Sequence, residues 1–303
     1  MRKELPVWRS LMYVPVNVEK YVDKAHTRGA DVIQLDIEDS VPPAEKARAR
    51  TMVQKAAARV RRGGADVVVR INRPLSLAVR DIEESVCPDV DGIACTKVDS
   101  ASHLRLLDEL VTELEEKRGM TPGHTKFIAM IETADAFFRI HEIVKASERS
   151  VACVIGGEDF ALECNMQPTG EALFYPKQHM VIAANAAGIM PLGFVDSVAG
   201  FGDWEAFRKM VRRSRDFGFM GAGCIHPGQV TIVNEEYTPT AAEVEYARKV
   251  ITLDKEAAAS GRGSFSLDGK MIDIPIIVRA QRLIRRYDAI KAREAKTMAA
   301  ANG

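Results

Sequence analysis

Short apolar segments rich in β-branched residues recur along this chain and constrain its fold more than any other feature. Stretches with helical periodicity separate most of them, for example residues 103–117 and 203–218. The predicted strands are 11–16, 32–37, 67–71, 92–98, 127–131, 151–155, 191–196 and 222–226. Eight strands that alternate with helices are typical of a TIM (β/α)8 barrel, and a chain of 303 residues can hold one barrel of about 250 residues.

A doubly wound sheet is the alternative α/β architecture. It would need a glycine-rich phosphate loop directly after the first strand. No such loop follows residues 11–16, and the glycines at 218–223 lie next to the last predicted strand instead. The barrel is therefore the predicted fold.

The alternating pattern ends near residue 230. We expect a helix over 237–263 that begins at Pro239-Thr240 and ends at Gly261. A short segment, 264–275, precedes a last helix from Pro275 to about Ala292, and the final residues have no pattern that would hold them in place. The sequence thus predicts a catalytic barrel over 1–230 and a helical appendage over 231–303.

Bulk composition excludes several classes of protein. Lys and Arg together number 42, as do Asp and Glu, so no overall charge attracts nucleic acid or an anionic membrane. No apolar stretch reaches membrane-spanning length, and the N-terminal residues contain no continuous apolar signal segment. The five cysteines are scattered without a metal-binding pair, and Cys95, Cys153 and Cys224 lie in apolar runs. We expect a cytoplasmic protein with buried thiols.

Two carboxylates follow neighbouring predicted strands. Glu132 comes after KFIAMI and Asp159 after VACVIGGE, with one predicted helix, 135–145, between them. Carboxyl ends of parallel strands line the mouth of an α/β barrel, so the two acids could share Mg²⁺, which binds oxygen ligands. The alternative is that either acid caps the following helix. Glu158 should point away from the site, because side chains alternate in an extended segment.

A second polar group lies at the ends of the second and third strands. Arg70 stands inside the apolar run VVVRI, where an unpaired guanidinium would be costly. It must pair with carboxylates or bind an anionic substrate through its planar fork, and we favour the substrate. Asp36, Glu38 and Asp39 end the preceding strand, and some of these acids should line the mouth of the barrel.

Several motifs, taken together and in order, resemble those of the HpcH/HpaI aldolase–citrate lyase β-subunit superfamily. The resemblance runs from about residue 9 to 285 and is nearest to the stand-alone malyl-CoA, β-methylmalyl-CoA and citramalyl-CoA lyases. It implies a TIM barrel, a Mg²⁺ cofactor with Mn²⁺ as an alternative ion, and reversible cleavage of a 3-hydroxyacyl-CoA to acetyl- or propionyl-CoA and a 2-oxo acid. The motifs are RSLMYVPVNVEKYVDKA, ADVIQLDIEDSVPPAEKARAR, VVVRIN, IET, GGEDFA, FVDSV, GFMGAGCIHPGQV and GKMIDIP.

Family precedent implies roles for individual residues. It assigns the metal to Glu132 and Asp159, in agreement with the positions of the two acids. Arg70 would hold the 2-oxo acid carboxylate and the thioester oxygen and stabilise the enolate. Val195 and Asp196 would line the substrate pocket at a strand end.

The same resemblance places coenzyme A near Tyr13, Lys20 and Lys24. The two lysines are four residues apart and so share one face of a predicted helix, where they could meet phosphates. Two departures affect this part of the resemblance. Val16 stands where the family has glycine, and Ala222 stands where it has lysine.

Asp273 lies in the segment GKMIDIP, which resembles the lid of the CoA lyases. In those enzymes this aspartate reaches the active site of a neighbouring subunit and exchanges a proton with the enolate carbon. The resemblance therefore implies a homo-oligomer, a trimer or a multiple of it. From the residues alone, Asp273 would be interpreted as a residue at the N-terminus of a helix, just before Pro275.

Other functions remain open at this point. A metal-dependent pyruvate aldolase would need the acidic pair but neither a CoA site nor a lid aspartate. A citrate lyase β subunit would act on an acyl-carrier thioester within a complex, and a catalytically silent binding protein would keep only the fold. The lysines at 20 and 24 and the segment GKMIDIP favour the CoA lyase, and the intact acidic pair argues against a silent protein.

Overall fold

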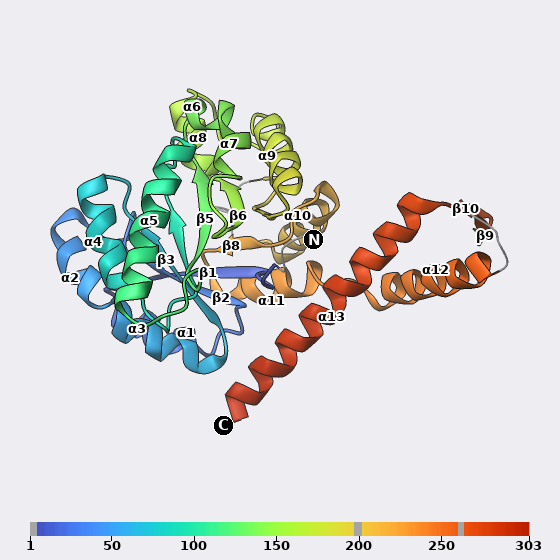
Figure 1. Ribbon diagram of the computed structural model, residues 1–303, viewed down its shortest axis with the longest axis horizontal. Helices are drawn as coiled ribbons and strands as arrows, with labels where there is room; N and C mark the ends of the chain where they lie inside the picture. The colour runs from blue at the N-terminus through green and yellow to red at the C-terminus, as the bar shows by residue number, and fades with distance from the viewer. Residues whose placement is uncertain (1–4, 197–201, 260–263, 303) are drawn as a thin grey trace. The chain divides into compact units, whose positions relative to one another are not determined.

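The computed structural model describes residues 5–196, 202–259 and 264–302 (Figure 1). The chain forms two compact units, Met1–Tyr237 and Thr238–Gly303. The predicted boundary at 230/231 falls inside helix α11 (Pro227–Glu236), which belongs to the first unit.

The first unit is a nearly closed barrel of eight parallel strands surrounded by helices. Strands follow one another in chain order around the sheet, with β1 also paired to β8. A parallel bridge between Leu192 and Gly221 links the remaining two edges. This order confirms the TIM-type barrel and excludes a doubly wound sheet. The strands are β1 Ser10–Pro15, β2 Val32–Asp36, β3 Asp66–Ile71, β4 Gly92–Cys95, β5 Lys126–Ile131, β6 Ser150–Ile155, β7 Met190–Leu192 and β8 Ala222–Cys224.

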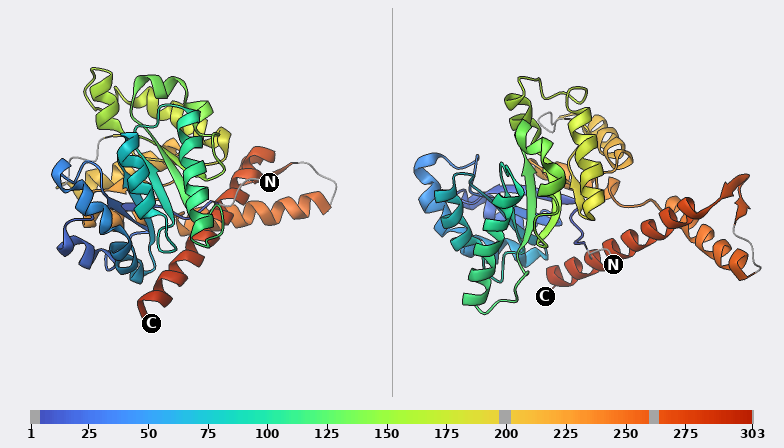
Figure 2. Two further views of the ribbon diagram at one scale, coloured as in Figure 1. Left: turned by 60° about the vertical axis from the view of Figure 1, so that its left-hand side comes forward. Right: turned by 45° about the horizontal axis from the view of Figure 1, so that its top comes forward.

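Helices cover the outer face of these strands, as both views of Figure 2 show. The helices predicted over 103–117 and 203–218 are confirmed, whereas the single helix predicted over 135–145 is two short ones. The α-helices of this unit before α11 are α1 Glu19–Ala25, α2 Lys46–Thr51, α3 Val53–Val60, α4 Leu75–Ser85, α5 Ala101–Lys117, α6 Ala134–Phe138, α7 Ile140–Ile143, α8 Gly157–Glu163, α9 Phe174–Ala187 and α10 Trp204–Phe217. Two short 3-10 helices are η1 Pro43–Glu45 and η2 Arg61–Gly63.

Two predicted strands extend at least three residues too far, and the one predicted over 222–226 ends two residues earlier, at Cys224. The strand predicted over 92–98 ends at Cys95 because Lys97 adopts a left-handed backbone with a φ of 47°. The strand predicted over 191–196 ends at Leu192 because Gly193, with a φ of 141°, leaves the extended conformation.

Alternation along the strands decides which side chains face the barrel interior. One buried cluster inside the barrel contains Val32 of β2 and Val68 of β3, while their neighbours Ile33 and Val69 pack outward against the helices. Residues two positions apart share a face of a strand. The interior faces of β2 and β3 therefore end in Asp36 and Arg70, which are neighbours in the sheet.

The second unit consists of α12 (Ala241–Ala259), a hairpin of β9 (Phe265–Leu267) and β10 (Lys270–Ile272), and α13 (Ile274–Asn302). Asp268 and Gly269 join the two strands, and both have positive φ, as a two-residue hairpin turn of type I′ requires. The predicted end of α12 at Gly261 lies outside the described residues. Helix α13 continues past Ala292, where the sequence analysis ended it, because the last residues are mostly strong helix formers such as Ala, Lys and Met.

Two further findings concern the whole described chain. None of its helices combines the length and the apolar composition that crossing a bilayer requires. Cys95, Cys153 and Cys224 are buried free thiols as predicted, and burial raises the pKa of each, that of Cys153 to about 12.

Candidate active site

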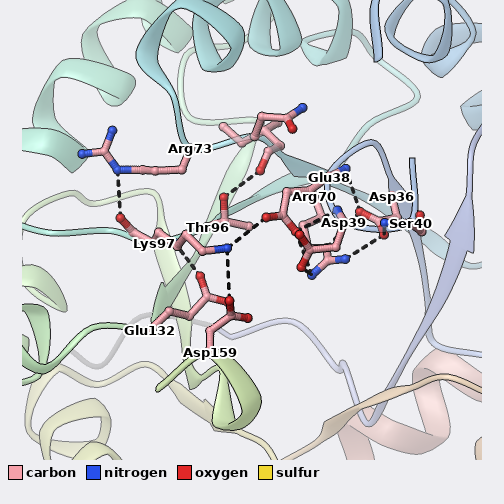
Figure 3. A network of polar contacts seen from close by, with 12 residues as sticks. Asp36, Glu38, Asp39, Ser40, Arg70, Arg73, Thr96, Lys97, Glu132 and Asp159 are labelled. Carbon is pink, nitrogen blue, oxygen red and sulfur yellow. Dashed lines mark hydrogen bonds and ion pairs between the residues drawn. The ribbon is translucent and has the colours of Figure 1, made fainter. Parts of the chain in front are cut away.

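Charged side chains from five successive strands, β2 to β6, and the residues that follow them meet at the carboxyl ends of the barrel strands (Figure 3). Glu38 follows β2, Arg70 lies on β3, and Lys97 follows β4. Glu132 comes directly after β5, and Asp159 lies in the first turn of α8, which follows β6. Because parallel strands end at the same rim of a barrel, residues far apart in sequence become neighbours here.

Arg70 is held by a carboxylate of the neighbouring strand. Its Nε and Nη2 donate to the two oxygens of Asp36 at 2.9 and 2.7 Å, and Nη1 lies 3.1 Å from Glu38 Oε2 and 3.6 Å from Asp39 Oδ2. Burial alone would raise the pKa of Asp36, but the hydrogen bonds and charge of Arg70 outweigh it and lower that pKa. The ion pairing considered from the sequence is therefore present, and a contact with substrate remains a prediction.

Lys97 is the central residue of this cluster, and the sequence analysis missed it. Its backbone N–H donates to Glu132 Oε2 at 2.6 Å. Its ammonium lies 3.1 Å from Glu38 Oε1 and 3.4 Å from Asp159 Oδ1. In the sequence, Lys97 is recognisable only as a lysine just past an apolar strand. Because 92–98 was interpreted as one strand, Lys97 was not considered as a residue at the strand end. Lys97 thus brings Glu132 and Asp159 to a common point.

Electrostatics at this point favour the binding of a cation. Burial raises the pKa of Glu132 to about 7; the charges of Asp159 and Glu38 add to the rise, and Lys97 opposes it. Burial also raises the pKa of Glu38. Conversely, burial alone would lower the pKa of Lys97, but the charges of the three acids outweigh it and raise that pKa. The acids therefore repel one another, and Lys97 offsets only part of the cost of ionising Glu132.

Local geometry leaves space for Glu132. A Cβ atom on Gly156 would lie 2.5 Å from both Cγ and Oε1 of Glu132, so only glycine fits there without moving the acid. The first turn of α6 is capped by the hydroxyl of Thr133, which accepts the N–H of Ala136. Glu132 is consequently not the cap of that helix, and its carboxylate faces Lys97.

The donor set fits Mg²⁺ bound partly by protein. In the ranges that the structure describes, no group of three or more His, Cys, Asp or Glu side chains could hold a metal ion by itself. Mg²⁺ does not need such a cage, because it is usually bound by one or two carboxylates together with water and substrate oxygens. Glu132 and Asp159 could supply those two carboxylates.

A cavity of about 170 Å³ adjoins the acidic cluster. It extends from Tyr13 past Gly156 and Glu158 to Lys177 and Asp196. Glu158 lies in the first turn of α8 rather than in an extended segment, so the alternation from which its orientation was predicted does not apply there. That it points away from the acidic pair stays a prediction.

Lys177 of α9 is a second functional candidate that sequence reasoning missed. Its Nζ donates to the backbone carbonyl of Asp196 at 3.5 Å, and only 6% of the residue is exposed. Burial lowers its pKa to about 8, although the charges of Asp196 and Glu158 oppose this shift. Its sequence context, an apolar helix in FYPKQHM, gives no local sign of a cavity.

The predicted pocket residues Val195 and Asp196 lie in the loop after β7 rather than on a strand. Val195 is buried and donates its N–H to Ser214 Oγ at 3.0 Å, whereas Asp196 lines the cavity.

The predicted CoA contacts do not form one cluster in the first unit. Tyr13 lines the interior cavity, with its ring centroid 5.0 Å from Arg70 Cζ. Lys20 and Lys24 are exposed on α1, at the spacing that places them on one face. Their role toward a CoA molecule stays a prediction.

Asp273 lies in the second unit, between β10 and α13. Its backbone carbonyl accepts the N–H groups of Ile276 and Ile277, as at the start of a helix. The residue is exposed, and so are the apolar side chains of Met271 and Ile274 on either side. These contacts match the helix-start alternative, and a lid function stays a prediction.

Comparison with known proteins identifies the family. The sequence model described as HpcH/HpaI aldolase/citrate lyase matches residues 9–227. The chain belongs to this family. It is therefore an enzyme of the aldolase/citrate lyase type, as the sequence motifs predicted.

Relatives within the HpcH/HpaI family cover nearly the whole chain. The citrate lyase subunit beta of Leuconostoc mesenteroides subsp. cremoris is 34% identical over 93% of both chains. An L-malyl-CoA/beta-methylmalyl-CoA lyase of Cereibacter sphaeroides is 32% identical over 94% of this chain and 96% of the relative. Among solved structures, the CitE protein of Mycobacterium tuberculosis in complex with magnesium, acetoacetate and coenzyme A is 26% identical, with a TM-score of 0.72 over 95% of this chain and all of that chain.

Proposed function

We propose that this enzyme is a Mg²⁺-dependent carbon–carbon lyase that reversibly cleaves a short 3-hydroxyacyl-CoA thioester to acetyl- or propionyl-CoA and a 2-oxo acid. One observation carries the proposal: at the barrel mouth, beside Arg70, Glu38 and Asp159 converge on the ammonium of Lys97 and Glu132 accepts the backbone N–H of the same residue. The magnesium and coenzyme A of the solved CitE relative and the activity named for the Cereibacter relative support it.

Glu132 and Asp159 would hold the ion. A bound Mg²⁺, or Mn²⁺ in its place, supplies a Lewis acid that lowers the pKa of the substrate hydroxyl and polarises the 2-oxo acid. The raised pKa of Glu132 and the space left by Gly156 support this choice of ligands.

Arg70 stabilises the negative charge of the thioester enolate, and Asp36 orients it. The bidentate Asp36 pair fixes the plane of the guanidinium, so little reorganisation is needed when charge develops on the substrate. Asp273 delivers a proton to the enolate carbon in the cleavage direction and removes it in synthesis. We infer, from the family precedent for this aspartate, that it acts in a neighbouring copy of the chain and that the active unit is a trimer or a multiple of it.

A citrate lyase β subunit is the second candidate, favoured by the identity to the Leuconostoc protein. The two candidates differ in the thioester carrier. The CoA lyase requires a free CoA thioester, for which the exposed pair Lys20 and Lys24 offers two cations that could meet phosphates. A citrate lyase subunit would need an acyl-carrier protein and would not cleave CoA esters alone.

Two measurements test the proposal. The first is release of 2-oxo acid from malyl-, methylmalyl-, citramalyl- and citryl-CoA, and from a citryl acyl-carrier thioester, with and without Mg²⁺. Cleavage only of an acyl-carrier thioester would select the second candidate, and no Mg²⁺ dependence would reject both.

The second measurement is Mg²⁺ titration of Glu132→Gln and Asp159→Asn by calorimetry, with the exposed Glu142→Gln as control. Both site variants should bind Mg²⁺ more than tenfold more weakly; unchanged affinity in both would reject the metal assignment.

A further inference from the structure

Lys97 has a backbone conformation that lysine rarely adopts, and three contacts impose it. Its φ of 47° lies in the left-handed region. The carbonyl of Lys97 accepts Arg73 Nε at 3.0 Å. On either side, the Thr96 hydroxyl donates to a carbonyl of β3 at 2.8 Å, and the Val98 N–H donates to a carbonyl of β5 at 3.1 Å. The turn is thus anchored to both neighbouring strands.

Glycine would adopt this conformation at lower cost than lysine. A left-handed backbone costs a residue with a side chain on the order of 1–2 kcal/mol, and glycine avoids this penalty. Such strain is commonly found where a side chain has a role in a functional site. The contacts of Lys97 indicate its role.

Both hydrogen-bond donors of Lys97 face acids, which come from three different elements. The backbone N–H binds Glu132, and the ammonium lies between Glu38 and Asp159 (Figure 3). The charge of Arg70 is offset by its bidentate partner Asp36. When Glu38, Glu132 and Asp159 are all ionised, the single ammonium of Lys97 therefore leaves two negative charges uncompensated. That excess matches one divalent cation, so Lys97 sets how much positive charge the site still needs.

We propose that Lys97 is a positioning residue and an internal counter-ion of the metal site: its N–H fixes Glu132, and its ammonium holds Glu38 and Asp159 and limits the affinity for a divalent ion. The inference rests on the proposed function, since it assumes that Glu132 and Asp159 hold Mg²⁺. A moderate affinity lets the substrate's own oxygens contribute to binding of the ion, so that ion and substrate bind together.

The test is calorimetric Mg²⁺ titration of the full-length protein without substrate. Lys97→Met removes the ammonium and keeps the backbone N–H, so Mg²⁺ should bind roughly ten- to a hundredfold more tightly, given the repulsion between a divalent and a univalent cation a few ångströms apart. Lys97→Gly removes the same charge without the backbone cost and should tighten binding similarly. Lys97→Arg keeps the charge and should stay within about threefold of wild type. The exposed Lys145→Met, before β6, is the matched control for loss of one charge.

The possible outcomes separate the two proposals. Tighter binding by either uncharged variant, with wild-type affinity in the control, supports the counter-ion; a residue with only a structural role would weaken binding when lost. Equal or weaker binding by folded Lys97→Met and Lys97→Gly overturns it, while normal wild-type binding leaves the metal site intact. Absence of Mg²⁺ binding by the wild-type protein overturns the proposed metal site itself.

Discussion

Replacement of Gly156 by alanine perturbs the metal site through a single methyl group. Gly156 has a φ of −73° and a ψ of 92°, which alanine adopts without strain, so the effect of the change is steric. The added carbon would lie 2.5 Å from Cγ and Oε1 of Glu132. Because the Gly156 N–H is bound to the carbonyl of Ile131 at 3.0 Å, the backbone is tied to β5 and the acid must move.

The size of the effect follows from these distances. Carbon atoms in contact prefer a separation of about 3.5–4.0 Å, so the Glu132 side chain must shift by about 1 Å. Its 2.6 Å hydrogen bond from the Lys97 N–H would then be lost or weakened. Overpacking of this kind lowers the free energy of unfolding by about 1–3 kcal/mol. We expect Mg²⁺ affinity to fall at least about tenfold, which corresponds to roughly 1.4 kcal/mol.

Gly157→Ala is the matched control. A Cβ atom there would lie 3.2 Å from Leu173 Cδ1, the end of a flexible side chain that can yield. Calorimetric Mg²⁺ titration and thermal unfolding of both variants measure the two effects separately. If Gly156→Ala bound Mg²⁺ as tightly as Gly157→Ala, Glu132 would not be a ligand in the position described.

Three further changes test other residues. Arg70→Lys loses the planar fork, so turnover should fall at least about tenfold; near-normal turnover would make Arg70 a structural ion-pair residue. Asp273→Asn should abolish cleavage and acetyl-CoA proton exchange but not Mg²⁺ binding. Exchange of subunits between this variant and Arg70→Ala should restore some activity. If verified exchange restored none, the site would lie within one chain, or Asp273 would be only a helix-start residue. Burial lowers the pKa of Lys177 to about 8 in the folded protein. Between about pH 8 and 10.5 the unfolded chain therefore binds more protons than the folded one. The contribution of Lys177 to the free energy of unfolding rises with pH in that window. Lys177→Met should remove this rise in denaturant unfolding at pH 8 and 10, and an unchanged rise would assign it to another group.

Local patterns were sufficient to predict the barrel and part of the candidate site. Each strand carries its own apolar period, and parallel strands all end at one rim, so positions just past those strands meet at the mouth. Glu132 and Asp159 could be selected on this basis alone, and both contact Lys97. Arg70 could be singled out because a guanidinium inside an apolar strand needs a partner.

Tertiary structure alone decided how these residues are arranged. Lys97 enters the site because its neighbours are tied to β3 and β5, strands that are separate in sequence, and no local pattern encodes a backbone imposed by such contacts. Asp36 accepts the two hydrogen bonds of the Arg70 guanidinium because β2 and β3 pair in the register that places the two residues side by side. Lys177 lines a cavity only after α9 packs beside the strand ends, since burial is a property of the surroundings and not of the residue.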